Sequence, residues 1–223
     1  NFYERRARRI LPALFFVMLV CIPFAWIWML PDPFENFGQS IVATTLSGNN
    51  ILLFLTSGYW DLAAKFKPLL HTWSIGIEGQ YYIFFPLLFV VIWRFGQSLV
   101  YWLVIFITFI SFALSEWLSR EAPEAAFYLI HARAWELFSG SISAFIMYNT
   151  KLKKSGSLAL FGLTVIFISV FAYGENTRWP SIYTLPPVIG VMLVILFADK
   201  ETFTAKILRA RALVAIGLIS YSA

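Results

Sequence analysis

Long apolar runs, separated by short polar segments, repeat along this chain of 223 residues. A run of about 20 apolar residues is long enough to cross a hydrocarbon core roughly 30 Å thick as a helix. Sustained two-residue alternation, the pattern of a membrane barrel, is missing, and only helices or closed barrels satisfy the backbone in lipid. The pattern therefore predicts an all-α fold, a polytopic transmembrane helix bundle. The predicted spans are residues 10–30, 72–93, 98–118, 126–148, 157–173 and 182–198, with a partial span at 212–223.

Residues 40–56 are the doubtful segment, because Ser47, Gly48, Asn49 and Asn50 interrupt its centre. Lys and Arg are normally more numerous on the cytoplasmic side, so their distribution indicates whether the segment crosses. If it does not cross, the two sides hold 12 and 5 basic residues, and if it does, they hold 9 and 8. The first topology is favoured, and it makes residues 40–56 re-entrant or half-buried. The predicted outer set is then Lys65, Lys67, Arg120, Arg133 and Arg178.

Composition supports a membrane protein. Hydrophobic residues make up 60% of the chain and charged residues 13%, whereas about 25% of an average soluble domain is charged. Cys21 has no partner for a disulfide, and neither metal-ligand spacing nor a nucleotide-binding glycine motif occurs. We expect a lipid bilayer as partner, no metal and, with a net charge of only +5, no nucleic acid. We also expect residues 1–223 to be one transmembrane domain truncated at both ends, since the last residues stop inside an apolar run.

Polar side chains interrupt the apolar run at residues 68–93. On a regular helix His71, Glu78 and Tyr82 project within about 20° of one direction, with Ser74 on the flank of that face. His71 and Glu78 would lie roughly 10 Å apart along the axis, lining a path rather than forming a pair. A carboxylate at membrane depth costs about 2.5–3.5 kcal/mol and needs a partner or water. Two interpretations stay open: a functional stripe near the outer surface, or a helix-to-helix tie at Glu78 beside an interfacial histidine.

A second polar pair lies in the segment HARAWELFSG, residues 131–140. Arg133 and Glu136 are three residues apart and can form an ion pair on one helix turn. Such a pair either stabilises the bundle or takes a direct part in chemistry, and the sequence leaves both roles open.

Four arginines gather near the predicted cytoplasmic surface, in the segment FYERRARRILPAL: Arg5, Arg6, Arg8 and Arg9. They could serve only as a topology signal or bind anionic lipid headgroups. On a helix, however, several of them share faces, and guanidinium forks suit a phosphorylated ligand. A phosphate-bearing donor that approaches from the cytoplasm would dock there.

Together these segments resemble a known family. FYERRARRILPAL, SGYWDLAAKFKPLLHTWSIGIEGQYYIFFPLL, FYLIHARAWELFSG and LVAIGLISYS are similar, in order and spacing, to the acyltransferase 3 family of bacterial integral membrane O-acyltransferases. The resemblance covers essentially the whole chain. It implies a ten-helix domain in the bacterial inner (cytoplasmic) membrane. The implied activity moves an acyl group, usually acetyl from acetyl-CoA, to hydroxyls of cell-envelope saccharides such as O-antigen, peptidoglycan or exopolysaccharide.

The resemblance also implies roles for individual residues. Arg5, Arg6, Arg8 and Arg9 match a motif thought to engage the coenzyme, which would be an acyl donor rather than a tightly bound cofactor. The expected catalytic residues are His71, Ser74, Glu78, Arg133 and Glu136, and the expected substrate-binding residues are Trp73, Tyr82 and Trp135. Two departures matter. The family usually has two consecutive glutamates where this chain has Glu78 and Gly79, and the histidine believed to act as its base falls before residue 1.

Two hypotheses follow. The first is an enzyme that takes acetyl from acetyl-CoA at the cytoplasmic mouth and delivers it to a sugar hydroxyl on the outer side. The second is a transporter or non-catalytic scaffold in which the polar stripe conducts protons or solute. Transporters often show paired broken helices in inverted repeats, and this chain has one broken segment, which favours the enzyme.

Overall fold

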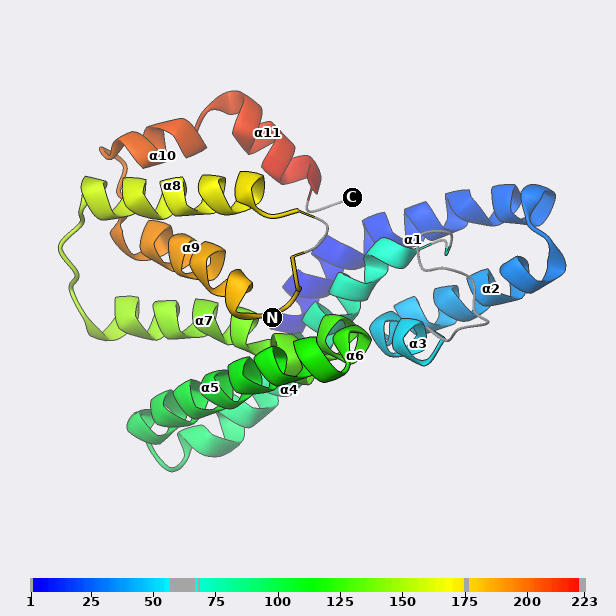
Figure 1. Cartoon of the computed structure of the whole chain (residues 1–223), viewed down its shortest axis with the longest axis horizontal. Coiled ribbons are helices and arrows are strands. Elements are labelled where there is room, and N and C mark those ends of the chain that lie inside the picture. The colour runs from blue at the N-terminus through cyan, green and yellow to red at the C-terminus, as the bar shows by residue number, and fades with distance from the viewer. Residues whose placement is uncertain (1, 57–66, 68, 175–176, 221–223) are drawn as a thin grey trace. The chain divides into compact units, whose positions relative to one another are not determined.

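The structure is a computed structural model that describes residues 2–56, 67, 69–174 and 177–220. Every regular element in these residues is a helix, which confirms the all-α prediction (Figure 1). Lys65, residues 57–64 of the second motif and residues 221–223 of the partial span lie outside the described residues. The helices are α1 Phe2–Trp28, α2 Pro31–Thr45, α3 Asn49–Leu55, η2 Leu70–Thr72, α4 Trp73–Trp93, α5 Gln97–Glu121, α6 Pro123–Tyr128, α7 Ile130–Asn149, α8 Gly156–Ala172, η3 Ile182–Thr184, α9 Leu185–Phe197, α10 Phe203–Leu208 and α11 Arg211–Ser220.

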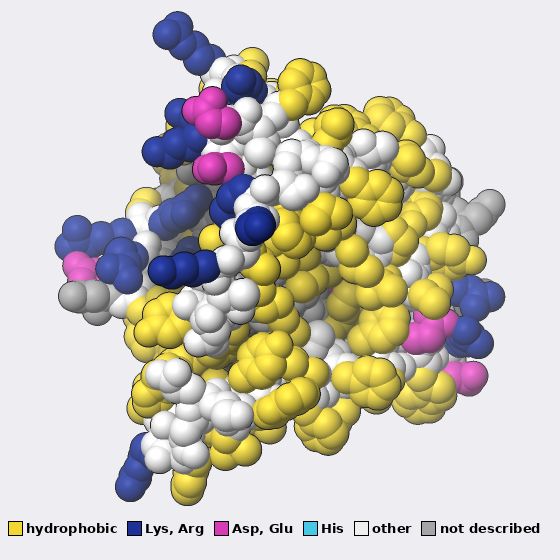
Figure 2. All heavy atoms as spheres, turned by 90° about the vertical axis from the view of Figure 1, so that its left-hand side faces the viewer, with side chains coloured by type: hydrophobic (Ala, Val, Ile, Leu, Met, Phe, Trp, Pro, Cys, Tyr) yellow, Lys and Arg dark blue, Asp and Glu magenta, His cyan; other side chains and the backbone are white. Residues whose placement is uncertain are grey.

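The surface of these helices is suited to lipid. Phe2–Trp28, Leu70–Trp93 and Gln97–Glu121 are long and apolar enough to cross a membrane, and Gly156–Ala172 and Ile182–Phe197 are shorter apolar helices. Large apolar side chains are exposed on these helices, for example Phe171 at 82% and Phe109 at 69%. Hydrophobic side chains cover much of the face in Figure 2, while Lys and Arg lie mostly over its left part and at its right edge. Exposing so much apolar area to water would be costly, and the chain is a multi-pass membrane protein.

The helices form two compact units, residues 1–82 with 210–223, and residues 83–209. In the first unit α2 folds back beside α1, and their core contains Leu14, Met18, Ala25 and Phe37. The helical structure is interrupted between α2 and α3, where Ser47 adopts a left-handed φ of 55°. Neither α2 nor α3 is among the described helices long enough to cross a membrane.

In the second unit α5 packs on α7, and α8 packs on α9 (Figure 1). Ser111 of α5 joins the first pair, because its hydroxyl donates to the His131 carbonyl at 2.7 Å and accepts from the Trp135 amide at 3.0 Å. The His131 carbonyl and the Trp135 amide are the two groups that one regular helical hydrogen bond would join, so the Ser111 hydroxyl binds α7 at both ends of that bond.

Two glycines allow α8 and α9 to approach closely. A Cβ on Gly162 would lie 2.6 Å from the Gly190 carbonyl oxygen. In the same way, a Cβ on Gly190 would lie 2.7 Å from the Gly162 carbonyl oxygen. Helices in lipid associate largely through van der Waals contact, which small residues bring within reach. The reciprocal contact explains why neither position can hold a larger side chain without separating the helices.

We predict that Gly162→Ala destabilises the protein by about 1–3 kcal/mol, because the new methyl overpacks a backbone contact. The matched control is Gly140→Ala in α7, where a Cβ would meet nothing within 4 Å. That change should leave the melting temperature unchanged or raise it, since Ala favours helices by about 1 kcal/mol over Gly. Thermal unfolding in detergent measures both variants, and equal melting temperatures would contradict the proposed contact.

Candidate active site

Glu78, Tyr82 and Arg6 form a connected polar group in the first unit. The Tyr82 hydroxyl donates to Glu78 Oε2 at 3.4 Å, one helix turn away in α4. The guanidinium carbon of Arg6, from α1, lies 5.0 Å from the centre of the Tyr82 ring, within the range where a ring face attracts a cation. Arg6 also interacts electrostatically with Glu78. The sequence pattern predicts the arginines at the cytoplasmic surface and Glu78 in a separate stripe that begins near the outer surface, whereas the structure joins one arginine to the carboxylate through Tyr82.

The other three arginines of this segment are exposed along α1. Arg8 pairs with Glu4 at 2.8 Å, but the two side chains are 80% and 54% exposed, and such pairs contribute little to stability. Arg6 is half-buried and therefore differs from Arg5, Arg8 and Arg9. The segment thus presents three exposed arginines beside one half-buried arginine that contacts the Tyr82 ring.

His71 does not continue the stripe predicted for a regular helix. It lies in the short η2 turn before α4 begins at Trp73, and its side chain is exposed. A 3₁₀ turn advances each residue by more than an α-helix does, which alters the direction of His71 relative to Glu78. Ser74 donates to the His71 carbonyl at 3.2 Å, and Trp73 is half-buried beside it. Glu78 and Tyr82 therefore stand together, and His71 is a separate feature at the helix entrance.

A buried amide network fixes the start of α4 against the break between α2 and α3. Asn49 is fully buried and donates to the Leu69 carbonyl at 3.1 Å and to the Thr72 hydroxyl at 2.7 Å. Gln80 donates to Asn50 Oδ1 at 2.9 Å and to the Ser47 carbonyl at 3.0 Å. The bonds of these amides could not be predicted from the sequence, in which the polar interruption at Asn49 and Asn50 was the only signal.

Arg133 and Glu136 pair within α7 of the second unit. The distance from Arg133 Nη2 to Glu136 Oε2 is 3.2 Å, and the two side chains are only 15% and 22% exposed. The Arg133 guanidinium also lies 5.4 Å from the Phe127 ring centre. Glu136 Oε1 and Trp135 Nε1 are buried with no hydrogen-bond partner among the described residues. The Trp135 ring packs edge-on against Phe112 at 5.0 Å, so its body is fixed while its polar atom stays unpaired.

Neither unit gathers three or more metal-ligating His, Cys, Asp or Glu side chains within the described part of the chain. The groups present are instead cations that suit phosphate and carboxylates that suit proton transfer.

Comparison with known proteins decides the family. The sequence model of the acyltransferase domain family matches residues 1–223. The chain belongs to this acyltransferase family. It is 30% identical to an uncharacterised protein of Haemophilus influenzae over 209 residues, which cover 87% of this chain and 85% of that protein. No solved structure shows significant similarity.

Other relatives of this acyltransferase domain are longer proteins. A Staphylococcus aureus protein provisionally named an O-acetyltransferase is 28% identical and aligns with 100% of this chain. The peptidoglycan O-acetyltransferase OatA of Listeria monocytogenes is 25% identical and aligns with 99% of this chain. The acyltransferase domain described here spans 39% and 38% of the lengths of these two proteins.

The structure accounts for Gly79, where a second consecutive glutamate was expected. A Cβ at Gly79 would lie 2.6 Å from Ser47 Oγ and 2.7 Å from Ser47 Cβ. The break before α3 therefore occupies the space in which a side chain at position 79 would begin. In this acyltransferase domain Glu78 is the carboxylate that this part of α4 retains.

We predict that Gly79→Ala lowers the melting temperature, with an overpacking cost of about 1–3 kcal/mol. Ser47→Gly should rescue it in the double variant, because it removes the colliding atoms and relieves a left-handed backbone conformation that suits glycine. Thermal unfolding of the wild type, the two single variants and the double variant tests this. Additive effects without rescue would show that Ser47 and Gly79 are not in contact.

We predict that Arg133→Met costs about 3–5 kcal/mol of stability, because it leaves Glu136 buried without its cation. The double variant Arg133→Met with Glu136→Met should recover most of that loss, since no unpaired charge remains. Unfolding and acyl transfer are measured on the same samples. A double variant that is stable and active assigns the pair a structural role, and one that is stable and inactive assigns it a direct role.

Proposed function

We propose that the chain is the membrane domain of an O-acyltransferase that moves acetyl from acetyl-CoA to a hydroxyl of a cell-envelope saccharide. Family membership supports acyl transfer, and the names of longer relatives include O-acetyltransferases, one of them acting on peptidoglycan. The helices suited to a membrane support an enzyme of the bacterial inner membrane. The observation that carries the proposal is the contact of Arg6 with Tyr82 and of Tyr82 with Glu78.

This arrangement links a binding group to a reacting group. Acetyl-CoA carries phosphates, and Arg5, Arg6, Arg8 and Arg9 supply guanidinium groups that bind phosphate oxygens in pairs. Stacking on Tyr82 orients the Arg6 plane while leaving its N–H edge available. The donor's phosphates would therefore be held close to the residues that handle protons.

In the transfer step, the acceptor hydroxyl oxygen bonds to the thioester carbonyl carbon, and the bond from that carbon to sulphur breaks. The hydroxyl proton passes to a base, and the coenzyme leaves as the thiol after taking up a proton. We assign Glu78 to orientation and proton transfer, with Tyr82 fixing its carboxylate. We assign His71 and Ser74 to the outer entrance of the first unit, with Trp73 as an aromatic contact for substrate, and Trp135 to a separate aromatic contact in the second unit.

We predict that Glu78→Gln in the full-length protein lowers O-acetylation at least about 100-fold, because proton transfer by a positioned group typically contributes that much. Tyr82→Phe keeps the ring under Arg6 and should lower the rate about tenfold by releasing the carboxylate. Acetyl transfer from labelled acetyl-CoA in membrane vesicles measures the rate, and melting temperature measures folding. The matched control is Glu35→Gln, an exposed carboxylate of α2 bound only within its own helix among the described contacts.

Full O-acetylation by Glu78→Gln would remove Glu78 from the mechanism. Arg6→Gln adds a second measurement, because loss of phosphate binding raises the KM for acetyl-CoA more than it lowers kcat. An unchanged KM would show that Arg6 does not bind the donor.

A further inference from the structure

A pocket of about 660 Å³ lies in the second unit, between the end of α5 and the segment that leads into α9. Its volume is in the range of sites that hold small organic ligands. Glu116, Arg120, Tyr173, Arg178, Ser181 and Tyr183 contribute to its wall. A second hollow of about 450 Å³ is also lined by Arg120 and Arg178, together with Trp179. The two arginines therefore border both spaces.

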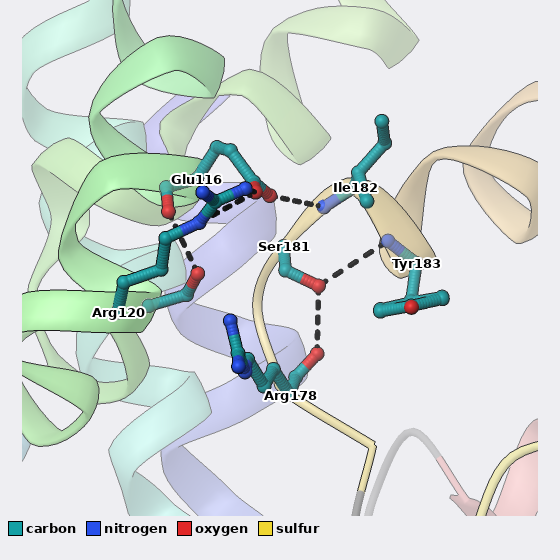
Figure 3. A network of polar contacts seen from close by, with 7 residues as sticks. Glu116, Arg120, Arg178, Ser181, Ile182 and Tyr183 are labelled. Carbon is teal, nitrogen blue, oxygen red and sulfur yellow. Dashed lines mark hydrogen bonds and ion pairs between the residues drawn. The ribbon is translucent and has the colours of Figure 1, made fainter.

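Hydrogen bonds shape the pocket wall (Figure 3). Glu116 Oε2 accepts from the Ile182 amide at 2.8 Å, and Oε1 accepts from Arg120 Nε at 3.1 Å. Ser181 donates to the Arg178 carbonyl at 2.8 Å and accepts from the Tyr183 amide at 3.2 Å. The bond between Glu116 and the Ile182 amide joins α5 to a segment 66 residues later in the chain. The wall is thus built by tertiary contacts before any ligand binds.

The charged residues of the described pocket lining are Glu116, Arg120 and Arg178, which together leave one net positive charge. Glu116 forms an ion pair with Arg120 and also interacts electrostatically with Arg178. Arg178 is exposed, and its guanidinium makes no hydrogen bond or short ion pair with any residue in the described part of the chain. One available guanidinium with five N–H donors matches a monoanion such as a carboxylate.

Aromatic rings complete the site. The Tyr173 ring lies 5.4 Å from Trp179 and 6.1 Å from Tyr183, measured between centroids. Flat rings with few, well-placed polar groups are typical of small-ligand pockets, and the apolar faces of sugar rings pack on such surfaces. Arg120 and Arg178 belong to the set of basic residues that the charge distribution predicts on the outer side of the membrane, where envelope saccharides lie.

We propose that this pocket binds the acceptor as a saccharide that carries a carboxylate, with Arg178 binding the carboxylate and Tyr173 and Tyr183 contacting the sugar ring. This inference rests on the proposed function, because it names the class of acceptor. It also gives the second unit a binding role that neither Glu78 nor the arginine segment fills.

Binding to the full-length protein in nanodiscs, without acetyl-CoA, tests the proposal. The probes are the tetramer of galacturonic acid and the neutral tetramer of galactose, titrated by calorimetry. We expect the acidic tetramer to bind at least about tenfold more tightly than the neutral one, and Arg178→Gln to remove about that factor for the acidic probe alone. The matched control is Arg209→Gln, an exposed arginine outside the pocket, which should bind both probes like the wild type.

Equal binding of the two tetramers, or unchanged binding by Arg178→Gln, would overturn the proposal. The proposal would also be overturned if Arg209→Gln weakened binding of the acidic tetramer as much as Arg178→Gln does. The effect would then reflect the total positive charge of the protein and not the pocket. Failure here is distinct from failure of the proposed function, which acetyl transfer to the native envelope measures separately. A protein that acetylates its envelope but does not prefer the acidic tetramer refutes the pocket and leaves the enzyme intact.

Discussion

In hydrocarbon, a polar group without a partner is expensive, and this requirement organises the first unit. The chain breaks between α2 and α3, which frees backbone groups and places two asparagines in the interior. Most of it is met by three amides: Asn49 donates to Leu69 and Thr72 just before α4, and Gln80 of α4 donates to Asn50 and to the Ser47 carbonyl, while Asn49 Oδ1 stays unpaired among the described residues. Irregular backbone is tolerated at membrane depth only where protein surrounds it. The network therefore bridges the interruption between α2 and α3, and it also fixes α4, the helix that carries Glu78.

The same requirement explains the surroundings of Glu78. A carboxylate on an apolar helix needs a donor and a cation, and Tyr82 and Arg6 provide them from one turn ahead and from α1. The arginine thereby gains an aromatic face, which compensates part of its lost hydration. Glu78 is thus stabilised by Tyr82 and Arg6 and keeps a polar group that can take part in proton transfer, which is what acyl transfer to a hydroxyl needs.

In the second unit, close packing of small residues and hydrogen bonds of short side chains hold the helices together. Gly162 and Gly190 bring two helices into backbone contact, and Ser111 joins two others through a single hydroxyl. The Arg133 and Glu136 pair satisfies only part of its polar surface, with Glu136 Oε1 left unpaired among the described residues. This unit also forms the pocket lined by Glu116, Arg120 and Arg178. Close helix packing and a candidate binding surface therefore come from the same unit.

The sequence by itself determined the helical class, the membrane setting and the family. These depend on local properties: apolar run length, the position of charges and short motifs. It also identified Glu78, Tyr82 and the pair of Arg133 and Glu136, because neighbours on one helix follow from the helical period. For His71 the prediction assumed a regular helix, whereas the residue lies in a 3₁₀ turn before Trp73, which alters the direction that a regular helix would give.

Only the tertiary structure decided which distant residues meet. Arg6 and Tyr82 are 76 positions apart in the sequence, Ser47 fills the space beside Gly79, and Glu116 binds the Ile182 amide. Such contacts depend on how whole helices pack, and that packing is set by the sum of many weak contacts rather than by any local pattern. A sequence period shows which face a residue occupies, but it does not show what the face will touch.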